Sequence, residues 1–511
     1  MIWALPLLVT LVATAEVKGT PEPCGCTSDP LGDVARVATL AKGGLWLDAG
    51  SLLYNREELS AERRPQADAT AATLAHIYGR ARVGLGAEDL AAGAAKVKPP
   101  RQACNARGMA REAPRVETID GVKVGVFGVV TPARVKPVAA TEPVGAAKKA
   151  VAELRKKGAQ LVVALCGMDR SETRALVKAV PGITFAVIGA EVGDGMAEPE
   201  PVAVGDGNAW LMAPADLARY AVKLTIDRRG DGPFVLYAGE AARKRAGEKA
   251  DKRIATLQAQ LAGWKKDPTA DKAFVAARQQ ELDELIGERR AMNGKPEPPP
   301  ATGNWFSYEL APVRHVIARD PEIADELRKL AQTIGHINVE AARGQPAPAA
   351  EPGAPTYVGN AACEKCHKPA VEFWKKTVHA QAWKTLVEVD KQYHYDCIGC
   401  HVTGWEKPGG VNLATVEKRG LVDVGCETCH GPGSKHVDEA GMEDPKTLVL
   451  KPAERFCADN CHTKEHSDTF ALVPYLRDIL GRGHGEKARA ALGNGPTGHE
   501  LRQKALAAAG R

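Results

Sequence analysis

The chain has 511 residues, enough for two or three domains that each bury a core of their own. Its 68 basic and 63 acidic residues leave a formal charge of only +5, so nothing in the composition indicates a nucleic-acid partner. Residues 1–12 are almost wholly apolar, and Ala13-Thr14-Ala15 follows as a small-x-small cleavage pattern. We therefore expect residues 1–15 to be a signal peptide, with an uncleaved anchor as the alternative. Cleavage would release an exported chain without a membrane span.

Short apolar runs rich in β-branched residues alternate with amphipathic segments over residues 16–240. The expected strands are 45–47, 122–130, 161–165 and 184–188, and the expected helices are 31–41, 146–157 and 171–180. This alternation predicts a layered α/β domain.

Several segments of this domain stand in a recognisable order. They are Pro30-Leu-Gly-Asp-Val-Ala-Arg36, Leu45-Trp-Leu-Asp-Ala-Gly50, Gly121–Gly128, Leu161–Leu165 and Pro181–Gly189. Together they resemble the 5′-nucleotidase branch of the metallophosphoesterases, a family that holds two metal ions with Asp and His residues at strand ends. The positions where the resemblance implies ligands carry Ser51, Gly86-Ala-Glu88, Gly167 and Ala190-Glu-Val192 instead. We therefore expect a degenerate domain without phosphatase activity.

Four cysteines of this region lie beside points where that family presents its active site: Cys24, Cys26, Cys104 and Cys166. Thiolates there could hold a soft metal or form a redox-active pair, and ordinary disulfides of an exported protein are the simpler interpretation. Because a C-x-C disulfide is strained, we expect Cys24 or Cys26 to pair elsewhere.

The next segments differ in composition. Residues 241–292 carry apolar residues at helical spacing, with Asp267-Pro268 as the turn, which predicts a helical hairpin. Its charges indicate a solvated face, and partner docking is the alternative. Residues 293–343 should supply a linker, a strand at 305–310 and a helix at 321–343 that complete the N-terminal part. The Pro/Ala run 344–355 is expected to be a linker and the main boundary of the chain.

The last third contains four cysteine pairs, each followed directly by histidine. The pairs are Cys363/Cys366, Cys397/Cys400, Cys426/Cys429 and Cys457/Cys461, and the histidines are His367, His401, His430 and His462. C-x-x-C-H is the attachment pattern of c-type haem: two thioethers tether the porphyrin, and the histidine ligates the iron. The last pair has three intervening residues, so this longer bridge must bulge to reach the same positions on the porphyrin. The alternative is a pair of zinc sites, but zinc does not require a histidine after every second cysteine.

The sequence around these motifs includes Tyr357-Val-Gly-Asn-Ala-Ala-Cys363, Val378-His-Ala380, Cys400-His-Val-Thr-Gly404 and Cys426–His436. It resembles the tetrahaem cytochrome c-554 family over about residues 356–485. The resemblance implies a mostly helical, loop-rich domain whose core is the stacked haems, after which residues 486–511 form a helical tail. Since c-type haem is attached outside the cytoplasm, it agrees with export, which we expect to be to a bacterial periplasm.

The second axial ligands must come from other residues of this part. Met442 is its only methionine, so paired histidines or five-coordinate iron are expected. The candidates are His379, His436, His466, His394 and His484, of which the first two lie in the best-matching motifs.

Two functions follow from these observations. The first is electron transfer through four haems, with redox proteins or a quinol-linked donor as partners. The alternative is an oxidoreductase in which a five-coordinate haem or the cysteine site acts on a small substrate.

Overall fold

The computed structural model describes residues 8–56, 58–198, 200–205, 207–266, 271–293, 298–439 and 447–511. The chain divides into two compact units. Unit 1 comprises Met1–Lys18, Leu40–Glu57 and Tyr78–Val313, and unit 2 comprises Gly19–Thr39, Glu58–Ile77 and Arg314–Arg511. Helix α1 (Val34–Ala41) crosses from one unit to the other.

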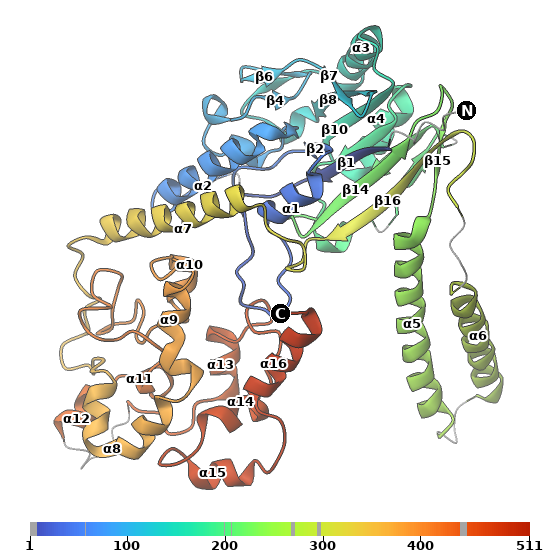
Figure 1. Cartoon of the computed structure of the whole chain (residues 1–511). Coiled ribbons are helices and arrows are strands. Elements are labelled where there is room, and N and C mark those ends of the chain that lie inside the picture. The colour runs from blue at the N-terminus through green and yellow to red at the C-terminus, as the bar shows by residue number, and fades with distance from the viewer. Residues whose placement is uncertain are drawn as a thin grey trace. The chain divides into compact units, whose positions relative to one another are not determined.

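The first sheet of unit 1 has six strands in the order β15-β16-β14-β1-β2-β3. They are β1 (Leu8–Thr14), β2 (Leu45–Asp48), β3 (Arg82–Val83), β14 (Tyr220–Asp227), β15 (Phe234–Leu236) and β16 (Asn304–Pro312). β1 pairs in parallel with β2 and antiparallel with β14, so it lies in the interior of the sheet. Figure 1 shows it between these two neighbours.

The position of β1 differs from the expectation of a signal peptide at residues 1–15. Val9, Leu11 and Val12 are at most 1% exposed, and cleavage after Ala15 would remove their strand from the middle of the sheet. The apolar sequence of residues 8–14 fits both a signal peptide and a buried strand, because both kinds of segment lack charged residues.

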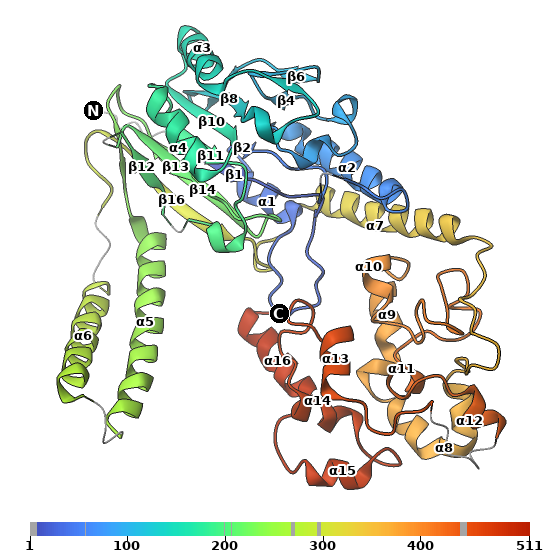
Figure 2. The same cartoon turned by 180° about the vertical axis from the view of Figure 1, so that it is seen from behind.

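The second sheet of unit 1 has the order β12-β13-β11-β10-β8-β7. Its strands are β7 (Arg115–Ile119), β8 (Val122–Val130), β10 (Leu161–Gly167), β11 (Phe185–Ile188), β12 (Val202–Val204) and β13 (Ala209–Met212). β8, β10, β11 and β13 run parallel to one another, which requires crossover connections, and helices α3 (Pro143–Lys156) and α4 (Arg170–Ala179) supply two of them. Figure 2 shows this sheet with α4 beside it.

The two sheets bury their facing apolar side chains in one core. Phe185 of the second sheet meets Phe306 of the first with ring centroids 5.1 Å apart, and both are fully buried. On the outer side of the second sheet, Ala147, Ala150 and Leu154 of α3 pack down toward β8. The expected α/β layered domain is therefore confirmed, as are the expected strands and helices within it.

Two short ribbons complete the strands of unit 1. β4 (Arg101–Gln102) pairs with β6 (Arg111–Glu112), and β5 (Ala106–Arg107) pairs with β9 (Ala139–Ala140).

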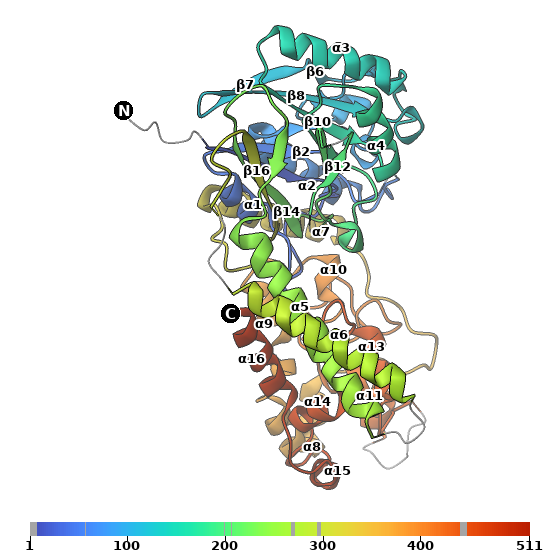
Figure 3. The ribbon, with the colours of Figure 1, turned by 90° about the vertical axis from the view of Figure 1, so that its right-hand side faces the viewer.

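The predicted hairpin is present as α5 (Gly239–Trp264) and α6 (Lys272–Ala291), which lie side by side in Figure 3. Leu257, Leu261 and Leu282 form the buried seam between them, as their helical spacing predicts. The expected turn Asp267-Pro268 lies outside the described residues.

Unit 2 is mostly helical, with long loops between its elements. Its helices are α2 (Arg64–Ile77), α7 (Pro321–Ala342), α8 (Asn360–Trp374), α9 (Ala382–Val387), α10 (Tyr395–Ile398), α11 (Cys426–His430), α12 (Ser434–Asp438), α13 (Glu454–Asn460), α14 (Leu472–Ile479), α15 (Glu486–Ala491) and α16 (Gly498–Ala509). Within the described ranges, no helix combines the length and apolar composition that crossing a membrane requires.

The last point at which the chain passes from unit 1 to unit 2 lies at residues 313–314, and the Pro/Ala run 344–355 lies within unit 2. The strand expected at 305–310 completes the first sheet as β16, but the helix expected beside it, α7, belongs to unit 2. There Asn338 of α7 donates a hydrogen bond to Tyr393 O over 2.8 Å. The run itself is bound to the same unit, because Asn412 Nδ2 donates to Pro346 O over 2.7 Å. Proline-rich composition therefore marks an irregular segment here, and not a free linker.

Candidate haem-binding site

Each of the four cysteine motifs begins on a helix of unit 2, which is α8, α10, α11 or α13. The first and third motifs lie wholly on their helices, where one turn places both sulfurs on the same side, whereas Cys400 and Cys461 follow the ends of α10 and α13. The third motif occupies all of α11, which ends at Gly431 with φ of +89°. In the first motif, α8 is kinked at His367, whose φ and ψ of −107° and 36° are not helical, two residues before Pro369. The helix is therefore interrupted at the histidine that is expected to ligate the iron.

The fourth motif accommodates its extra residue at a helix end. α13 stops at Asn460, and Cys461 adopts φ of −133°. The amides of Cys461 and His462 both donate to Cys457 O, over 3.2 and 2.8 Å. The longer spacer is thus folded back onto its own first cysteine, which keeps the two sulfurs and the histidine in one compact loop.

Motifs that are distant in sequence lie next to one another. Cys426 N donates to Asn360 Oδ1 of α8 over 2.9 Å, and Cys400 Sγ donates to Asn460 O over 3.5 Å. The first motif therefore adjoins the third, and the second adjoins the fourth. In the described part of the chain, no group of three or more His, Cys, Asp or Glu side chains is arranged to hold a metal ion directly, as a tetrahedral zinc site would need.

Cys366 differs from the other predicted attachment cysteines. Its side chain is exposed, whereas the seven others are partly buried, Cys363 of the same motif among them. The reason is its place on α8, where residues 365–369 are all exposed, so that this turn faces solvent. Cys366 is therefore the attachment cysteine that other protein segments cover least.

Three of the four motif histidines are oriented by hydrogen bonds at Nδ1. His401 Nδ1 lies 2.7 Å from Ala382 O, and His430 Nδ1 lies 2.7 Å from Val449 O. His462 Nδ1 lies 3.0 Å from Ser467 Oγ. Because a carbonyl oxygen only accepts, Nδ1 of His401 and of His430 carries the hydrogen and leaves the Nε2 lone pair free. This is the usual arrangement of a metal-ligating imidazole.

Three histidines from other segments face motif histidines across a constant gap. The ring centroids are 6.2 Å apart for His367 and His436, 6.3 Å for His462 and His379, and 6.0 Å for His430 and His484. An iron with two imidazole nitrogens at about 2 Å, and ring centres about 1 Å beyond them, would separate the centroids by roughly 6 Å. The spacing of all three pairs fits one iron between the rings.

The facing histidines have the surroundings of ligands. Burial lowers the pKa of His379 to about 4, with the neighbouring His462 adding to the effect, so its ring is neutral. His484 Nδ1 donates to Ile479 O over 2.6 Å, which frees Nε2. His436 Nδ1 is buried without a hydrogen-bond partner, a cost that a bound metal would remove.

His401 is the exception among the motif histidines. Among the described residues, no ring of another histidine lies in contact with it. The other two candidates are engaged elsewhere: His394 Nε2 donates to Ala331 O over 2.9 Å, and the exposed His466 binds Thr463 Oγ1 through Nδ1 over 2.8 Å. Met442 lies outside the described residues. The structure thus brings His379, His436 and His484 to motif histidines, and does not bring His394 or His466 to one.

The cysteines outside the motifs fall into two groups. Cys24 and Cys26 form a disulfide with each other, contrary to the expectation that one of them pairs elsewhere. Gly25 between them has φ of +78°, a left-handed conformation that turns both side chains to one side. Cys104 and Cys166 are free thiols in unit 1, and burial raises their pKa to about 11 and about 12. Both are therefore thiols near neutral pH, and in the absence of a metal ion they are weak nucleophiles.

The strand ends of unit 1 are packed shut. A Cβ built at Gly86 would lie 1.9 Å from Ser51 Oγ, and one at Gly167 would lie 2.1 Å from Leu85 O. Ser51 Oγ donates to Glu88, and the buried Asp89 accepts the amides of Ser51, Leu52 and Leu53. Two of the residues that stand where the resemblance implies ligands, Ser51 and Glu88, therefore bond to each other, and the backbone at Gly86 and Gly167 is closely packed.

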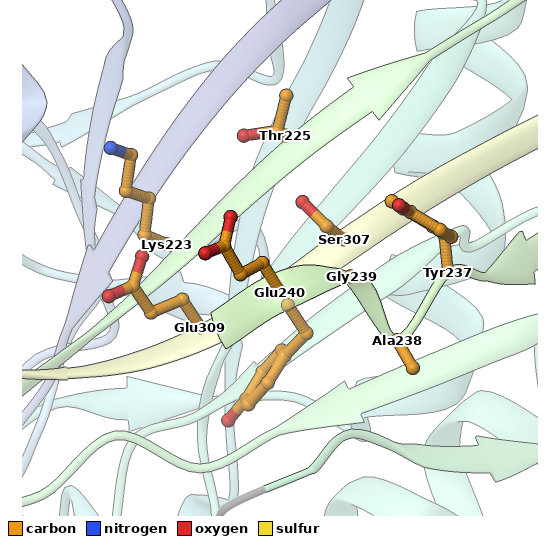
Figure 4. Close-up of a pocket in the computed structure, with 9 residues that line it drawn as sticks. Lys223, Thr225, Tyr237, Ala238, Gly239, Glu240, Ser307 and Glu309 are labelled. Atoms are coloured by element: carbon orange, nitrogen blue, oxygen red, sulfur yellow. The ribbon is translucent and has the colours of Figure 1, made fainter. Parts of the chain in front are cut away.

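A pocket of about 150 Å³ lies elsewhere in unit 1, where β14, β16 and the start of α5 meet (Figure 4). Its lining residues are Lys223, Thr225, Tyr237, Ala238, Gly239, Glu240, Ser307, Tyr308 and Glu309. Lys223 and Glu309 are cross-strand neighbours of the first sheet. Because no cysteine or histidine lines this pocket, it is not part of the haem-binding site.

Comparison with known proteins matches the C-terminal part to the family described as cytochrome c554 and c-prime, over residues 362–431. Cytochrome c-554 of Nitrosomonas europaea is 36% identical over 150 residues, which cover 23% of this chain and 63% of that protein. The chain therefore spans less than two thirds of this relative. The solved structure of reduced cytochrome c554 from Nitrosomonas europaea matches 21% of this chain and 66% of its own at 30% identity and a TM-score of 0.18.

The N-terminal part of the chain gives a different set of neighbours. A 5′-nucleotidase precursor from Thermus thermophilus matches with 17% identity and a TM-score of 0.43, covering 67% of this chain and 61% of its own. A calcineurin-like phosphoesterase from Bacillus subtilis matches with 16% identity and a TM-score of 0.34, covering 45% of this chain and 88% of its own. The match to the cytochrome c554 family is confined to residues 362–431, and this segment contains three of the four cysteine motifs. It supports a multihaem c-type cytochrome in this part of the chain.

Proposed function

We propose that this chain is an electron-transfer protein with four covalently bound haems, three of them held by two axial histidines and one, at His401, held by a single histidine. The observation that carries the proposal is the set of ring separations between motif and facing histidines, 6.0–6.3 Å in three independent places. Paired imidazoles hold the iron in one geometry through a redox cycle, which favours transfer over substrate chemistry.

The haem number is the first thing to test. Intact mass and absorption spectra of protein made in a host with c-type haem maturation should show four attached haems. A smaller mass gain would remove one of the proposed centres, and metal without haem would contradict the proposal as a whole.

A second function is favoured by one observation, the absence of a facing histidine at His401 within the described residues. An iron with an open position could bind and reduce a small molecule while the other centres supply electrons. Reduction of a small nitrogen or oxygen compound at this centre alone would establish that function.

Unit 1 is proposed to be a phosphoesterase-like domain without catalysis. The closed strand ends around Ser51, Gly86 and Gly167 support this, because metal-assisted hydrolysis needs ligands and space that are filled here. Phosphate release from nucleotides by the purified chain, with added divalent metal, would contradict it.

Export to a bacterial periplasm and exchange with redox proteins or a quinol-linked donor complete the proposal. Attachment of c-type haem outside the cytoplasm supports export. The propionates of four haems would change the formal charge from +5 to about −3, which favours a partner with a basic surface over a nucleic acid.

A further inference from the structure

The disulfide between Cys24 and Cys26 lies at the surface of unit 2. Cys24 is exposed and Cys26 is partly exposed, so both sulfurs can be reached from solvent. Exposed disulfides are the labile ones, whereas those that hold a fold together are shielded from attack. The exposure of its two sulfurs therefore indicates that the Cys24–Cys26 disulfide can be reduced by thiol or electron donors.

The loop that carries the disulfide, residues 22–28, is bound on one side to the segment before the second cysteine motif. Glu22 forms an ion pair with Lys391, whose Nζ lies 2.7 Å from Glu22 Oε1. Burial raises the pKa of the Cys397 thiol, and the Lys391 ammonium opposes that rise, so Lys391 lies within electrostatic reach of the motif. The entry to the loop is therefore fixed close to the second motif.

The other side of the loop is bound to the segment after the fourth motif. Ser28 N donates to Asp468 Oδ1 over 3.1 Å, and Arg502 donates to Thr27 O over 3.0 Å. In Figures 1 and 2 the blue loop before α1 reaches α16, which carries Arg502. Cys400 of the second motif donates to Asn460 O of the fourth over 3.5 Å, so the disulfide loop is bound to the segments that flank this pair of adjoining motifs.

A purely structural role does not account for this bond. A disulfide between residues two apart closes a very short loop, so it removes little conformational entropy from the unfolded chain. The loop is already held at both ends by Glu22–Lys391 and Ser28–Asp468, and neither contact involves a cysteine. The disulfide connects no two elements that would otherwise separate.

We propose that Cys24 and Cys26 form a redox-active dithiol–disulfide centre that exchanges electrons with the haems of unit 2 and acts on disulfide substrates. This inference rests on the proposed function, because the haems are its source of electrons. When the Cys24–Cys26 bond breaks, it takes up two electrons, one from each of two ferrous haems that become ferric, and two protons from water to give two thiols. A low-potential one-electron donor then restores the ferrous haems.

The dithiol completes a cycle by thiol–disulfide exchange. One thiolate attacks a substrate disulfide, forming a mixed disulfide and releasing one substrate thiol. The second cysteine then attacks its partner's sulfur, re-forms the Cys24–Cys26 bond and releases the other substrate thiol. The guanidinium groups of Arg502 and Arg511, which both donate to Thr27 O beside Cys26, favour a thiolate at this place.

The test uses the haem-loaded protein under strict exclusion of oxygen. The haems are reduced with a limiting amount of photoreduced deazaflavin, and the ferrous absorption is followed while samples are alkylated with N-ethylmaleimide and mapped by mass spectrometry. We expect ferrous absorption to decay by two haems per chain as both Cys24 and Cys26 become alkylated, with the same time course. The C24S/C26S double variant should keep its ferrous haems, and C104S, which changes a free thiol of unit 1, should behave like the wild type.

Two outcomes would overturn the inference, and they differ in what else they affect. Ferrous haems that persist beside an unalkylated Cys24 and Cys26 in the wild type would overturn it and leave the proposed function intact. Failure to attach haem would overturn both. The wild-type time course decides the matter alone, so the result does not depend on whether the double variant folds.

Discussion

His430 and His484 face one another with ring centroids 6.0 Å apart and ring planes at 89°. Each donates from Nδ1 to a backbone carbonyl, His430 to Val449 O and His484 to Ile479 O. The Nε2 atoms of both histidines are therefore free to bind one iron. The two residues come from separate parts of the chain, because His430 ends α11 and His484 lies in the loop between α14 and α15.

Replacement of His484 with alanine should convert one low-spin haem to high spin. The loss of one strong-field axial ligand leaves His430 as the only protein ligand of that iron. Electron paramagnetic resonance of the oxidised protein measures the change. H466A is the matched control, because His466 is exposed and bound to Thr463. A high-spin signal larger than that of the wild type in H466A but not in H484A would reverse the assignment.

The haem at His401 should bind external ligands without any substitution. Since no described histidine faces His401, carbon monoxide should bind one ferrous haem per chain, and the other three should resist it because both axial positions are filled. A carbon monoxide titration monitored by absorption gives the stoichiometry. H394A should leave that stoichiometry unchanged, because His394 already donates to Ala331 O. Absence of binding in the wild type would show that another group fills the position.

The fourth motif should attach a haem despite its longer spacer. Cys461 and His462 are held to Cys457 O by backbone hydrogen bonds, which keeps the cysteines within reach of one porphyrin. C457S/C461S should lower the mass gain by one haem, and C24S should not change it. Intact mass spectrometry measures both. An unchanged mass gain in C457S/C461S would mean that this motif carries no haem.

Much of this site could be predicted from the sequence, and the facing histidines could not. The cysteine spacing identifies each motif histidine locally, because attachment and ligation occur within five or six residues. The partners of His367, His430 and His462 come from remote segments, and only tertiary packing decides between His484 and His466 or His394. The signal that separates them is the backbone carbonyl at His394 Nε2, which no sequence pattern reveals.

Burial of the motif cysteines is likewise a property of packing. The spacing is the same for Cys363/Cys366 and Cys426/Cys429, yet Cys366 is exposed and the other three are partly buried. The local pattern identifies a cysteine pair as an attachment site, but the segments that cover it come from elsewhere in the chain.

The fold shows a similar division. The apolar runs of β8 and β10 predicted buried parallel strands, and the structure confirms them. The same kind of run at Leu8–Thr14 was equally consistent with a signal, because both require uncharged apolar residues. Helix α7 belongs to unit 2 because Asn338 and Ala342 are buried within that unit. The proline-rich composition of the segment after α7 does not predict this.

Asp48 should make the stability of unit 1 depend on pH. Burial raises its pKa from 3.8 to about 7, so the folded chain holds the proton more tightly than the unfolded chain. Its stabilising contribution is complete below pH 3.8 and is lost as the pH rises through about 7, a change on the order of a few kcal/mol in the free energy of unfolding.

The D48N variant is the control for this effect. The asparagine oxygen can still accept from Gly50 N, and its amide faces Thr14 Oγ1, so the site stays hydrogen-bonded without titrating. Denaturant unfolding between pH 4 and 8 should show the wild type losing stability relative to D48N as the pH rises. A difference between the two proteins that does not vary with pH would contradict the assignment.

The most direct test of the central claim is spin quantification by electron paramagnetic resonance on the fully oxidised, haem-loaded wild type. Three paired-histidine irons and one at His401 predict low-spin and high-spin haem in a ratio of three to one. Four low-spin haems would contradict the open position at His401, and more than one high-spin haem would contradict the histidine pairs on which the account depends.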